Sequence, residues 1–302
     1  MTLSNLQKPL VSIVVTTRNE ERNIENCLES IKLQTYSPIE IVVVDNASTD
    51  TTKELARRFT KAVVDKGPER SSQRNYGICS LAIGEYAMFI DADMILSPSL
   101  VESCVTEIEN KEVIALHIKE VILGRGILGR IRRFERSFYS GTVIDGSRFF
   151  RRETFCKIGG FDENLPPGPE DWDLDKRFKL LGRIELLDSV VMQADWPQAD
   201  FIAERGIAYD PRYVGIYHNE DTQSCTAYLK KKAYYSPSMK SYEHKWGKGD
   251  ADLKRQLGFK YRFITVFLEQ KRWKILIRHP ILTILLALLR VGVGTVYLVV
   301  RD

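Results

Sequence analysis

"VSIVVTT", residues 11–17, is a continuous run of apolar and β-branched residues. Such a run is typical of a strand that is covered on both faces of a parallel sheet. Similar runs lie at 39–45, 62–64 and 86–93, and patterns that suit helices fall between or after them, at 20–31, 49–59 and from Ser97 onward. This alternation predicts an α/β fold with a mainly parallel, doubly wound sheet and helices on both of its faces.

Charge is distributed unevenly along the 302 residues, although the net charge is only +4. Residues 228–278 contain 14 Lys and Arg against four Asp and Glu, whereas residues 1–227 carry a net charge of −7. An acidic body is therefore followed by a basic tail, which also contains many aromatic residues. A basic tail attracts either nucleic acid or the anionic lipids of a membrane surface.

The segment at 281–300, "ILTILLALLRVGVGTVYLVV", decides between these partners. About 20 apolar residues can cross the hydrocarbon core of a bilayer, and only Arg290 and two threonines interrupt this run. The positive-inside rule places in the cytoplasm the four basic residues that precede it, Lys271, Arg272, Lys274 and Arg278. We predict binding at the cytoplasmic face of a membrane and no nucleic-acid partner. A span, a helix at the membrane surface and a buried core helix all fit the pattern.

The five cysteines are scattered and odd in number, and no two are spaced as C-x-x-C: they are Cys27, Cys79, Cys104, Cys156 and Cys225. This pattern favours free thiols in a reducing compartment over a disulfide framework. The N-terminal "MTLSNLQKPL" has no apolar stretch behind a basic start, so we expect no secretory signal. Both observations favour the cytosol.

Polar side chains follow three of the predicted strands, at Thr16–Arg18, at Asp45–Asn46 and at Asp91–Asp93. The carboxyl ends of parallel strands meet at one edge of the sheet, where doubly wound folds bind their ligands. Asp91 and Asp93 form a D-x-D pair, and alternate side chains of an extended segment point to one side. Two such carboxylates suit Mg²⁺ or Mn²⁺, which prefer oxygen ligands and substrate phosphates. We therefore predict a metal–diphosphate site at this edge.

Seven segments, in this order, resemble motifs of the inverting nucleotide-sugar glycosyltransferases of family 2: "VSIVVTTRNE" (11–20), "IVVVDNASTDTT" (41–52), "RSSQRNYGI" (70–78), "GEYAMFIDADM" (84–94), "GGFDENL" (159–165), "PEDWDLDKRF" (169–178) and "YHNEDTQS" (217–224). The resemblance covers about residues 10–225 and implies the GT-A fold. With the charge and hydropathy patterns, it divides the chain into a catalytic domain at 1–227, a membrane-proximal tail at 228–278 and a hydrophobic membrane helix at 279–302.

The resemblance also implies roles for individual residues. Asp93 is the main metal ligand, Asp91 lies beside the metal and the ribose, and His218 meets the metal or the diphosphate. The donor-binding residues are Thr16, Arg18, Glu20, Asp45, Asn46, Arg70, Arg74 and Asp91. Many members of the family have an aspartate where this chain has Asn46, and an amide can donate as well as accept a hydrogen bond. UDP, GDP and dTDP sugars therefore all stay open as donors.

Inverting transfer needs a base, because a neutral hydroxyl is a poor nucleophile. The resemblance places this role on Asp171, with Glu170 and Trp172 on the acceptor side. Asp171 stands at the start of a predicted helix, whose dipole is expected to lower the pKa of this carboxyl. The basic amphipathic pattern at 124–141 favours an acceptor carried on a lipid phosphate. Two alternatives stay open: a sugar-nucleotidyltransferase, although no glycine-rich loop follows the first strand, and a non-catalytic nucleotide- or carbohydrate-binding protein of the same fold.

Overall fold

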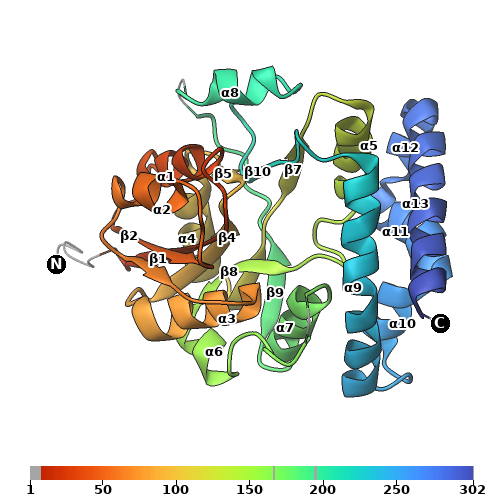
Figure 1. Cartoon of the computed structure of the whole chain (residues 1–302), viewed down its shortest axis with the longest axis horizontal. Helices are drawn as coiled ribbons and strands as arrows, with labels where there is room; N and C mark the ends of the chain where they lie inside the picture. Colours follow the sequence, from red (N-terminus) through yellow and green to blue (C-terminus); the bar gives the residue numbers. More distant parts are fainter. Residues whose placement is uncertain (1–7, 166, 194–195, 302) are drawn as a thin grey trace.

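A seven-stranded sheet forms the centre of the molecule (Figure 1), with the strand order β3-β2-β1-β4-β8-β6-β9. The computed structural model describes residues 8–165, 167–193 and 196–301. The strands are β1 (Val11–Thr17), β2 (Ile39–Asp45), β3 (Val63–Asp65), β4 (Tyr86–Asp91), β6 (Val113–His117), β8 (Ser147–Arg151) and β9 (Arg183–Leu186). Apart from β8, which is antiparallel to β4 and β6, neighbouring strands of this sheet are parallel. The prediction of a mainly parallel sheet is confirmed.

Parallel register brings the polar strand ends together. Thr17 of β1 pairs with Asp45 of β2, and Thr16 of β1 pairs with Asp91 of β4. The polar residues therefore gather at one edge of the sheet because three buried apolar runs end at the same level.

Helices cover both faces of the sheet, as predicted. On one face, α1 (Ile24–Lys32), α2 (Thr52–Arg57) and α4 (Leu100–Asn110) pack on side chains such as Ile13 and Val15. On the other face, Val14 lies in a second cluster, which is completed by η1 (Tyr76–Leu81), α6 (Arg152–Lys157) and α7 (Glu170–Lys179). The π-helix η1 directly continues α3 (Arg70–Asn75). Alternate residues of β1 thus enter opposite layers, which explains why the whole strand is apolar.

A second, three-stranded sheet joins β5 (Met94–Leu96), β10 (Ile216–Asn219) and β7 (Glu120–Leu123) in the order β5-β10-β7. His218 of β10 pairs with Met94 of β5, the residue that follows Asp93. The same His218 pairs with Ile122 of β7. This small sheet therefore carries His218, from late in the chain, to the D-x-D segment.

A helical layer packs against one side of this body (Figure 1), beginning with α5 (Ile127–Arg136). The rest of it is C-terminal: α9 (Cys225–Trp246), α10 (Ala251–Leu257), η2 (Tyr261–Thr265), α11 (Val266–Leu268), η3 (Glu269–Lys271), α12 (Trp273–Arg278) and α13 (Pro280–Arg301). The short helix α8 (Ala199–Glu204) lies apart from it. A shared cluster of buried residues, including Phe138, Tyr242 and Leu286, joins the layer to the body.

Helix α13 is the one helix of the described chain that is long and apolar enough to cross a membrane, judged by length and composition. It packs lengthwise against α9 and α5. Only 11% of the segment Pro280–Tyr297 is buried, so much of its apolar surface faces outward. Membrane binding stays a prediction at this point.

The prediction that all five cysteines are free is wrong for two of them. Cys79 of η1 and Cys156 of α6 form a disulfide, with their Cα atoms 5.6 Å apart. Cys27 and Cys104 are buried free thiols, and Cys225 is an exposed one. The paired cysteines are 77 residues apart in sequence, so their local spacing carried no sign of the bond that the tertiary fold allows.

Candidate active site

Asp91, the first carboxylate of the D-x-D pair, is held by a hydroxyl and two arginines. Thr16 Oγ1 donates to Asp91 Oδ1 at 2.9 Å, and Arg74 Nη2 lies 3.0 Å from the same oxygen. Arg70 Nη1 is 3.8 Å from Asp91 Oδ2. Burial alone would raise the pKa of Asp91, but Arg74 and Arg70 outweigh burial and hold this pKa far below its usual range. Asp91 is therefore a permanent negative charge beside two cations.

Arg74 joins this donor edge to helix α7. Its side chain is 1% exposed, and its Nη1 lies 3.3 Å from Asp171 Oδ1. The guanidinium packs over the Phe89 ring, 4.4 Å from the ring centre. Arg70 makes a parallel link, because its Nη2 reaches Glu170 Oε1 at 3.4 Å. The Arg74 guanidinium thus bridges the predicted donor-binding carboxylate, Asp91, and the predicted base, Asp171.

Asp171 is accessible, with 31% of its side chain exposed. Its environment raises the pKa of this carboxyl: burial is the main cause and Glu170 adds to it, while Arg74 opposes both. The predicted lowering of this pKa by the helix dipole is therefore wrong, although Asp171 does lie in the first turn of α7. A raised pKa suits a general base, which works best with a pKa near the operating pH. Gly146 lies in close contact with Asp171, and a side chain at position 146 would clash, because its Cβ would lie 2.8 Å from Asp171 Cβ.

Asp93 and His218 form the part of the site that fits a cation. His218 Nε2 lies 3.2 Å from Asp93 Oδ2, and His218 Nδ1 lies 2.7 Å from Glu120 Oε1. Asp93 Oδ1 is buried without a hydrogen-bond partner, as expected of an oxygen that awaits a ligand. Within the described residues no group of three or more His, Cys, Asp or Glu is placed to hold a metal ion. The donor set therefore fits Mg²⁺ or Mn²⁺ only if substrate phosphates and water supply most of the ligands, which is common for Mg²⁺.

A buried charge network continues from His218 toward α7, the helix that carries the predicted base. Burial lowers the pKa of His218, but Asp93 and Glu120 outweigh burial and raise it well above its usual value. Glu120 Oε2 pairs with Arg136 at 3.2 Å, and Arg136 pairs with Asp145 at 2.8 Å. Asp145 lies 3.7 Å from His117, whose other ring nitrogen contacts Asp175 of α7. The two halves of the site are thus connected through the protein interior.

The sequence interpretation missed this network. Its members come from β10, β7, α5, the loop after α5, β6 and α7, and no two of them are adjacent in the sequence. The one available signal was Glu120, a carboxylate at the start of the apolar run "EVIL". An acid in that position needs a buried partner.

The other predicted donor-binding residues are placed less uniformly. Glu20 belongs to the acidic cluster, since burial, Asp93 and Asp91 all raise its pKa against a hydrogen bond from Asn23. Asp45 is buried, and both of its oxygens accept hydrogen bonds from Ser48. Two further predicted donor-binding residues are Asn46 and Arg18. An N–H of the Asn46 side chain donates a hydrogen bond to the Pro68 carbonyl, and Arg18 is exposed.

The two acceptor-side residues differ in their surroundings. Glu170 is 3% exposed, and its carboxylate accepts a hydrogen bond from the Gly168 amide while it pairs with Arg70. Trp172 packs into the helical layer beside Tyr242 and under the Arg262 guanidinium. Only 9% of Trp172 is exposed. Trp172 is therefore mostly a packing residue of the helical layer, and a direct contact with an acceptor stays a prediction.

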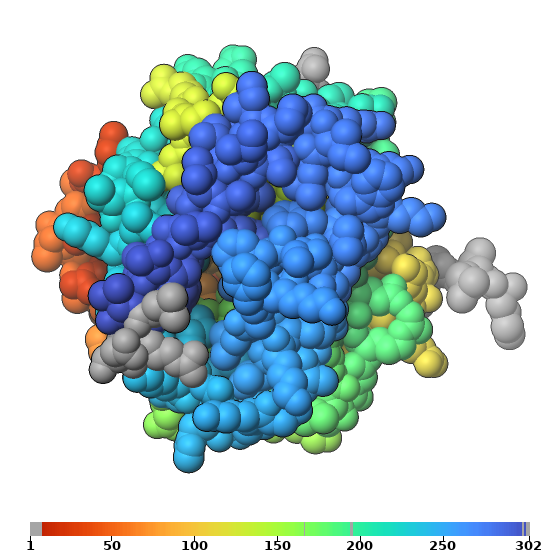
Figure 2. All heavy atoms as spheres, turned by 90° about the vertical axis from the view of Figure 1, so that its right-hand side faces the viewer, coloured from red at the N-terminus to blue at the C-terminus, as the bar shows by residue number. Residues whose placement is uncertain are grey.

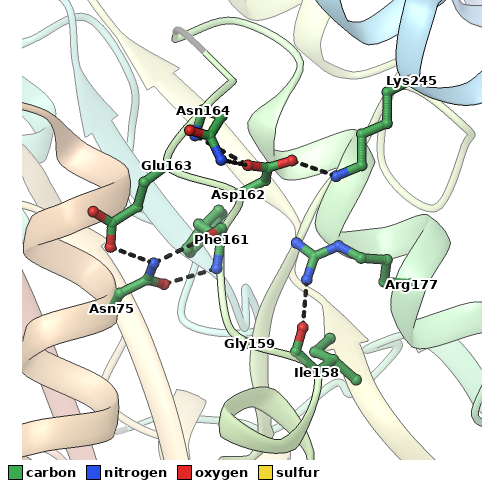
Figure 3. A pocket seen from close by; sticks show the side chains of 9 residues that line it. All are labelled: Asn75, Ile158, Gly159, Phe161, Asp162, Glu163, Asn164, Arg177 and Lys245. Atoms are coloured by element: carbon green, nitrogen blue, oxygen red, sulfur yellow. Dashed lines mark hydrogen bonds and ion pairs between the residues drawn. The ribbon is translucent and has the colours of Figure 1, made fainter.

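The "GGFDENL" segment forms the wall of a pocket of about 410 Å³ (Figure 3) between α3, α7 and the end of α9. Asn75 holds this segment with two bonds to the Phe161 backbone, at 2.9 and 2.7 Å. Lys245 pairs with Asp162 across the pocket, and Arg177 donates to the Ile158 carbonyl. The pocket contains none of the carboxylates of the D-x-D pair or the base. The motif instead fixes the loop that leads into α7.

Comparison with known proteins agrees with this geometry. Residues 12–161 match the family described as Glycosyl transferase family 2. The glycosyltransferase GlyG of Streptococcus pneumoniae is 32% identical over 156 residues, which cover 49% of this chain and 46% of GlyG. Across the first curated relatives, the matched region spans 30–46% of their length. The chain belongs to glycosyltransferase family 2.

Solved structures agree on the fold. The mannosyltransferase PcManGT from Pyrobaculum calidifontis, in complex with GDP-Man and Mn²⁺, superposes with a TM-score of 0.59 at 19% identity. The match covers 98% of this chain and 86% of PcManGT. TarS 1–349 of S. aureus, in complex with UDP-GlcNAc, gives a TM-score of 0.52 at 18% identity and covers 88% of this chain and 77% of that one. The predicted GT-A fold is confirmed.

Proposed function

We propose that this protein is a metal-dependent, inverting glycosyltransferase that moves a sugar from a nucleotide-diphosphate sugar to a hydroxyl or phosphate of a lipid-linked acceptor. One observation carries the proposal: the Arg74 guanidinium contacts both Asp91, at the donor edge, and Asp171, at the start of α7. A donor diphosphate at that edge and a base on α7 would then lie on opposite sides of the anomeric carbon. An inverting displacement needs this arrangement, because the acceptor attacks as the diphosphate leaves.

Each residue has a defined task in this reaction. Asp171 takes the proton from the acceptor oxygen, that oxygen forms a bond to the anomeric carbon, and the bond from that carbon to the diphosphate breaks. Arg70 and Arg74 place positive charge on the donor side. Asp93 and the neutral imidazole of His218 would hold a divalent cation, which would supply positive charge to offset the charge that develops on the diphosphate. Gly146 leaves the space that Asp171 needs.

Two structural relatives support a nucleotide-sugar donor but differ in the base. PcManGT is in complex with GDP-Man, and TarS is in complex with UDP-GlcNAc. In this chain one N–H of the Asn46 amide donates to the Pro68 carbonyl, which leaves the amide oxygen to accept from a nucleobase and the second N–H to donate to one. UDP, GDP and dTDP sugars are all candidates, and thermal shift in the presence of Mn²⁺ would identify the one that binds.

The lipid-linked acceptor and a position at the cytoplasmic face of a membrane are supported by the C-terminal part. Residues 228–278 are strongly basic, and α13 exposes apolar side chains to solvent. Both features suit a membrane surface. An enzyme held there would meet a lipid-linked acceptor at a raised effective concentration.

The proposal is tested by Asp171→Asn, which keeps the size of the side chain and removes the proton acceptor. Donor binding, measured as a thermal shift with and without Mn²⁺, should persist, while transfer should fall by about 10²–10⁴-fold. Glu153→Gln is the matched control, because Glu153 is an exposed carboxylate on α6. A loss of only a few fold would move the base elsewhere. Loss of donor binding would mean that Asp171 acts through the structure of the site.

A further inference from the structure

One side of α13 is an exposed apolar stripe. Its members recur every three, four or eight positions and are 58–73% exposed: Ile281, Ile284, Leu288, Val291 and Val299. The opposite side packs into the protein through residues such as Leu282, Leu286 and Leu289. The helix is therefore apolar on both sides, but the protein covers only one of them.

Further large apolar side chains are exposed on the elements that precede α13. Large apolar side chains before α13 are 41–71% exposed: Phe259, Ile264, Leu268, Trp273 and Ile277. Figure 2 shows that the C-terminal segment covers much of one side of the molecule, with α13 crossing it diagonally. Single exposed apolar residues are ordinary, but a concentration of this kind on one side marks a surface that another body covers.

The charge of this side indicates the nature of that body. Four exposed basic residues accompany the apolar ones: Lys260, Lys271, Lys274 and Arg278. Acids of the same segment are engaged within the protein, since Glu269 pairs with Arg255 and Asp250 pairs with Lys176. The side therefore combines an apolar centre with cations that form no ion pair within the described part of the chain, a combination that suits an anionic lipid surface.

Arg290 indicates how α13 would meet a membrane. Its side chain points inward and is 7% exposed, with Glu135 of α5 at 3.4 Å and the Tyr139 hydroxyl at 2.6 Å. A helix that crossed the bilayer would have to withdraw Arg290 from these partners and place it in hydrocarbon, which is costly. The helices that flank α13 also could not follow it, because α9 carries the run Lys230–Lys232.

We infer that the α10–α13 side docks onto an anionic membrane surface with α13 parallel to the plane of the bilayer and its stripe inserted below the headgroups. This deepens the proposed function and rests on it only for the lipid-linked acceptor. Leu286 of α13 belongs to the same buried cluster as Trp172, the neighbour of Asp171. Docking in this orientation would hold the base helix at a fixed distance from the membrane.

The test uses the full chain and vesicles of phosphatidylcholine with or without phosphatidylglycerol. Ile284→Ser/Leu288→Ser removes the centre of the stripe, and Ile83→Ser/Leu180→Ser is the control, because those residues are 72% and 76% exposed elsewhere. Partial burial of two such side chains predicts about 10- to 100-fold weaker binding to the anionic vesicles for the first pair. The control pair should bind as the unmodified chain does. All proteins should melt alike and bind donor alike, which separates this result from failure of the proposed function.

Extraction then distinguishes the modes of binding. A chain docked in the plane should be released from vesicles by alkaline carbonate, whereas a spanning helix would be retained, and retention would overturn the inference. Equal binding by both variants would also overturn it. A chain that ignores vesicles and runs as a dimer, which the stripe variant converts to a monomer, would show that this side is covered by a second copy. A monomer that ignores vesicles would equally refute docking.

Discussion

Replacing Arg74 with methionine should damage both stability and chemistry, because one guanidinium serves three carboxylates. Its nitrogens lie 3.0 Å from Asp91, 3.3 Å from Asp171 and 4.0 Å from Glu170. Methionine keeps an apolar side chain of similar length but loses the guanidinium that packs on Phe89, and it leaves the carboxylates facing one another with less positive charge. The pKa values of Asp91 and Asp171 should both rise, since Arg74 lowers each of them.

The magnitude follows from burial. At about 3 Å and an effective dielectric constant of about 20, each close ion contact corresponds to roughly 5 kcal/mol of Coulomb energy. Desolvation of the buried guanidinium offsets much of this, and breaking a buried pair costs roughly 3–5 kcal/mol. Asp91 and Asp171 keep 21% and 31% of their side chains exposed, so water partly replaces the lost partner. We therefore expect a loss near the lower limit, about 3 kcal/mol of unfolding free energy.

Urea denaturation followed by circular dichroism would measure this loss. Arg58→Met is the control, because Arg58 forms an exposed ion pair with Glu25 and such pairs contribute at most about 1 kcal/mol. Arg74→Lys should recover part of the stability but not the activity, because an ammonium cannot bridge two carboxylates as a planar fork does. If Arg74→Met denatures at the same urea concentration as the unmodified chain and transfers sugar normally, Arg74 does not hold the site together.

Two further predictions concern the interior. Burial lowers the pKa of His117, but Asp175 and Asp145 raise it overall, and His117 in turn lowers the pKa of Asp175 despite burial. Stability from His117 is complete below about pH 6.5 and fades as pH rises through its raised pKa, whereas stability from Asp175 is complete above about pH 4 and fades as pH falls. His117→Asn should therefore lower the free energy of unfolding most between about pH 4 and pH 6.5, by roughly 3 kcal/mol as measured by urea denaturation. A loss that does not vary with pH would refute the ion pair between His117 and Asp175. For the disulfide, we expect a thiol reagent in denaturant to react with three cysteines before reduction and with five after it. Reaction with all five before reduction would exclude the bond.

The strands that build the donor edge could be predicted almost to the residue. The runs at 11–17 and 39–45 are β1 and β2 without change. A parallel strand buried on both faces must be apolar throughout, so its length can be read directly from the sequence. The later strands β6 to β9 escaped prediction because they are only four or five residues long or interrupt the alternation, as the antiparallel β8 does.

The site shows the same division between local and long-range information. The D-x-D pair, Asp171 and His218 could be named because each belongs to a short motif. The direction of the pKa shift at Asp171 could not be predicted, because it depends on burial and on Glu170 more than on the helix dipole that the sequence suggests. Glu120, Arg136 and Arg148 form a buried ion cluster only through tertiary contacts.

Helix α5 is the element that links the proposed membrane side to the proposed metal site. Its residue Glu135 binds Arg290 of α13, and Arg132 and Arg290 outweigh burial to lower the pKa of Glu135 to about 2. The adjacent Arg136 binds Glu120, which orients His218 against Asp93. Consecutive residues of one helix thus face two different sites. Because α5 is held between them by buried charges, a shift of α13 that breaks the Arg290 contacts would also be felt at His218. The apolar layer is therefore part of the structure that positions the proposed metal ligands, in addition to any role at a membrane.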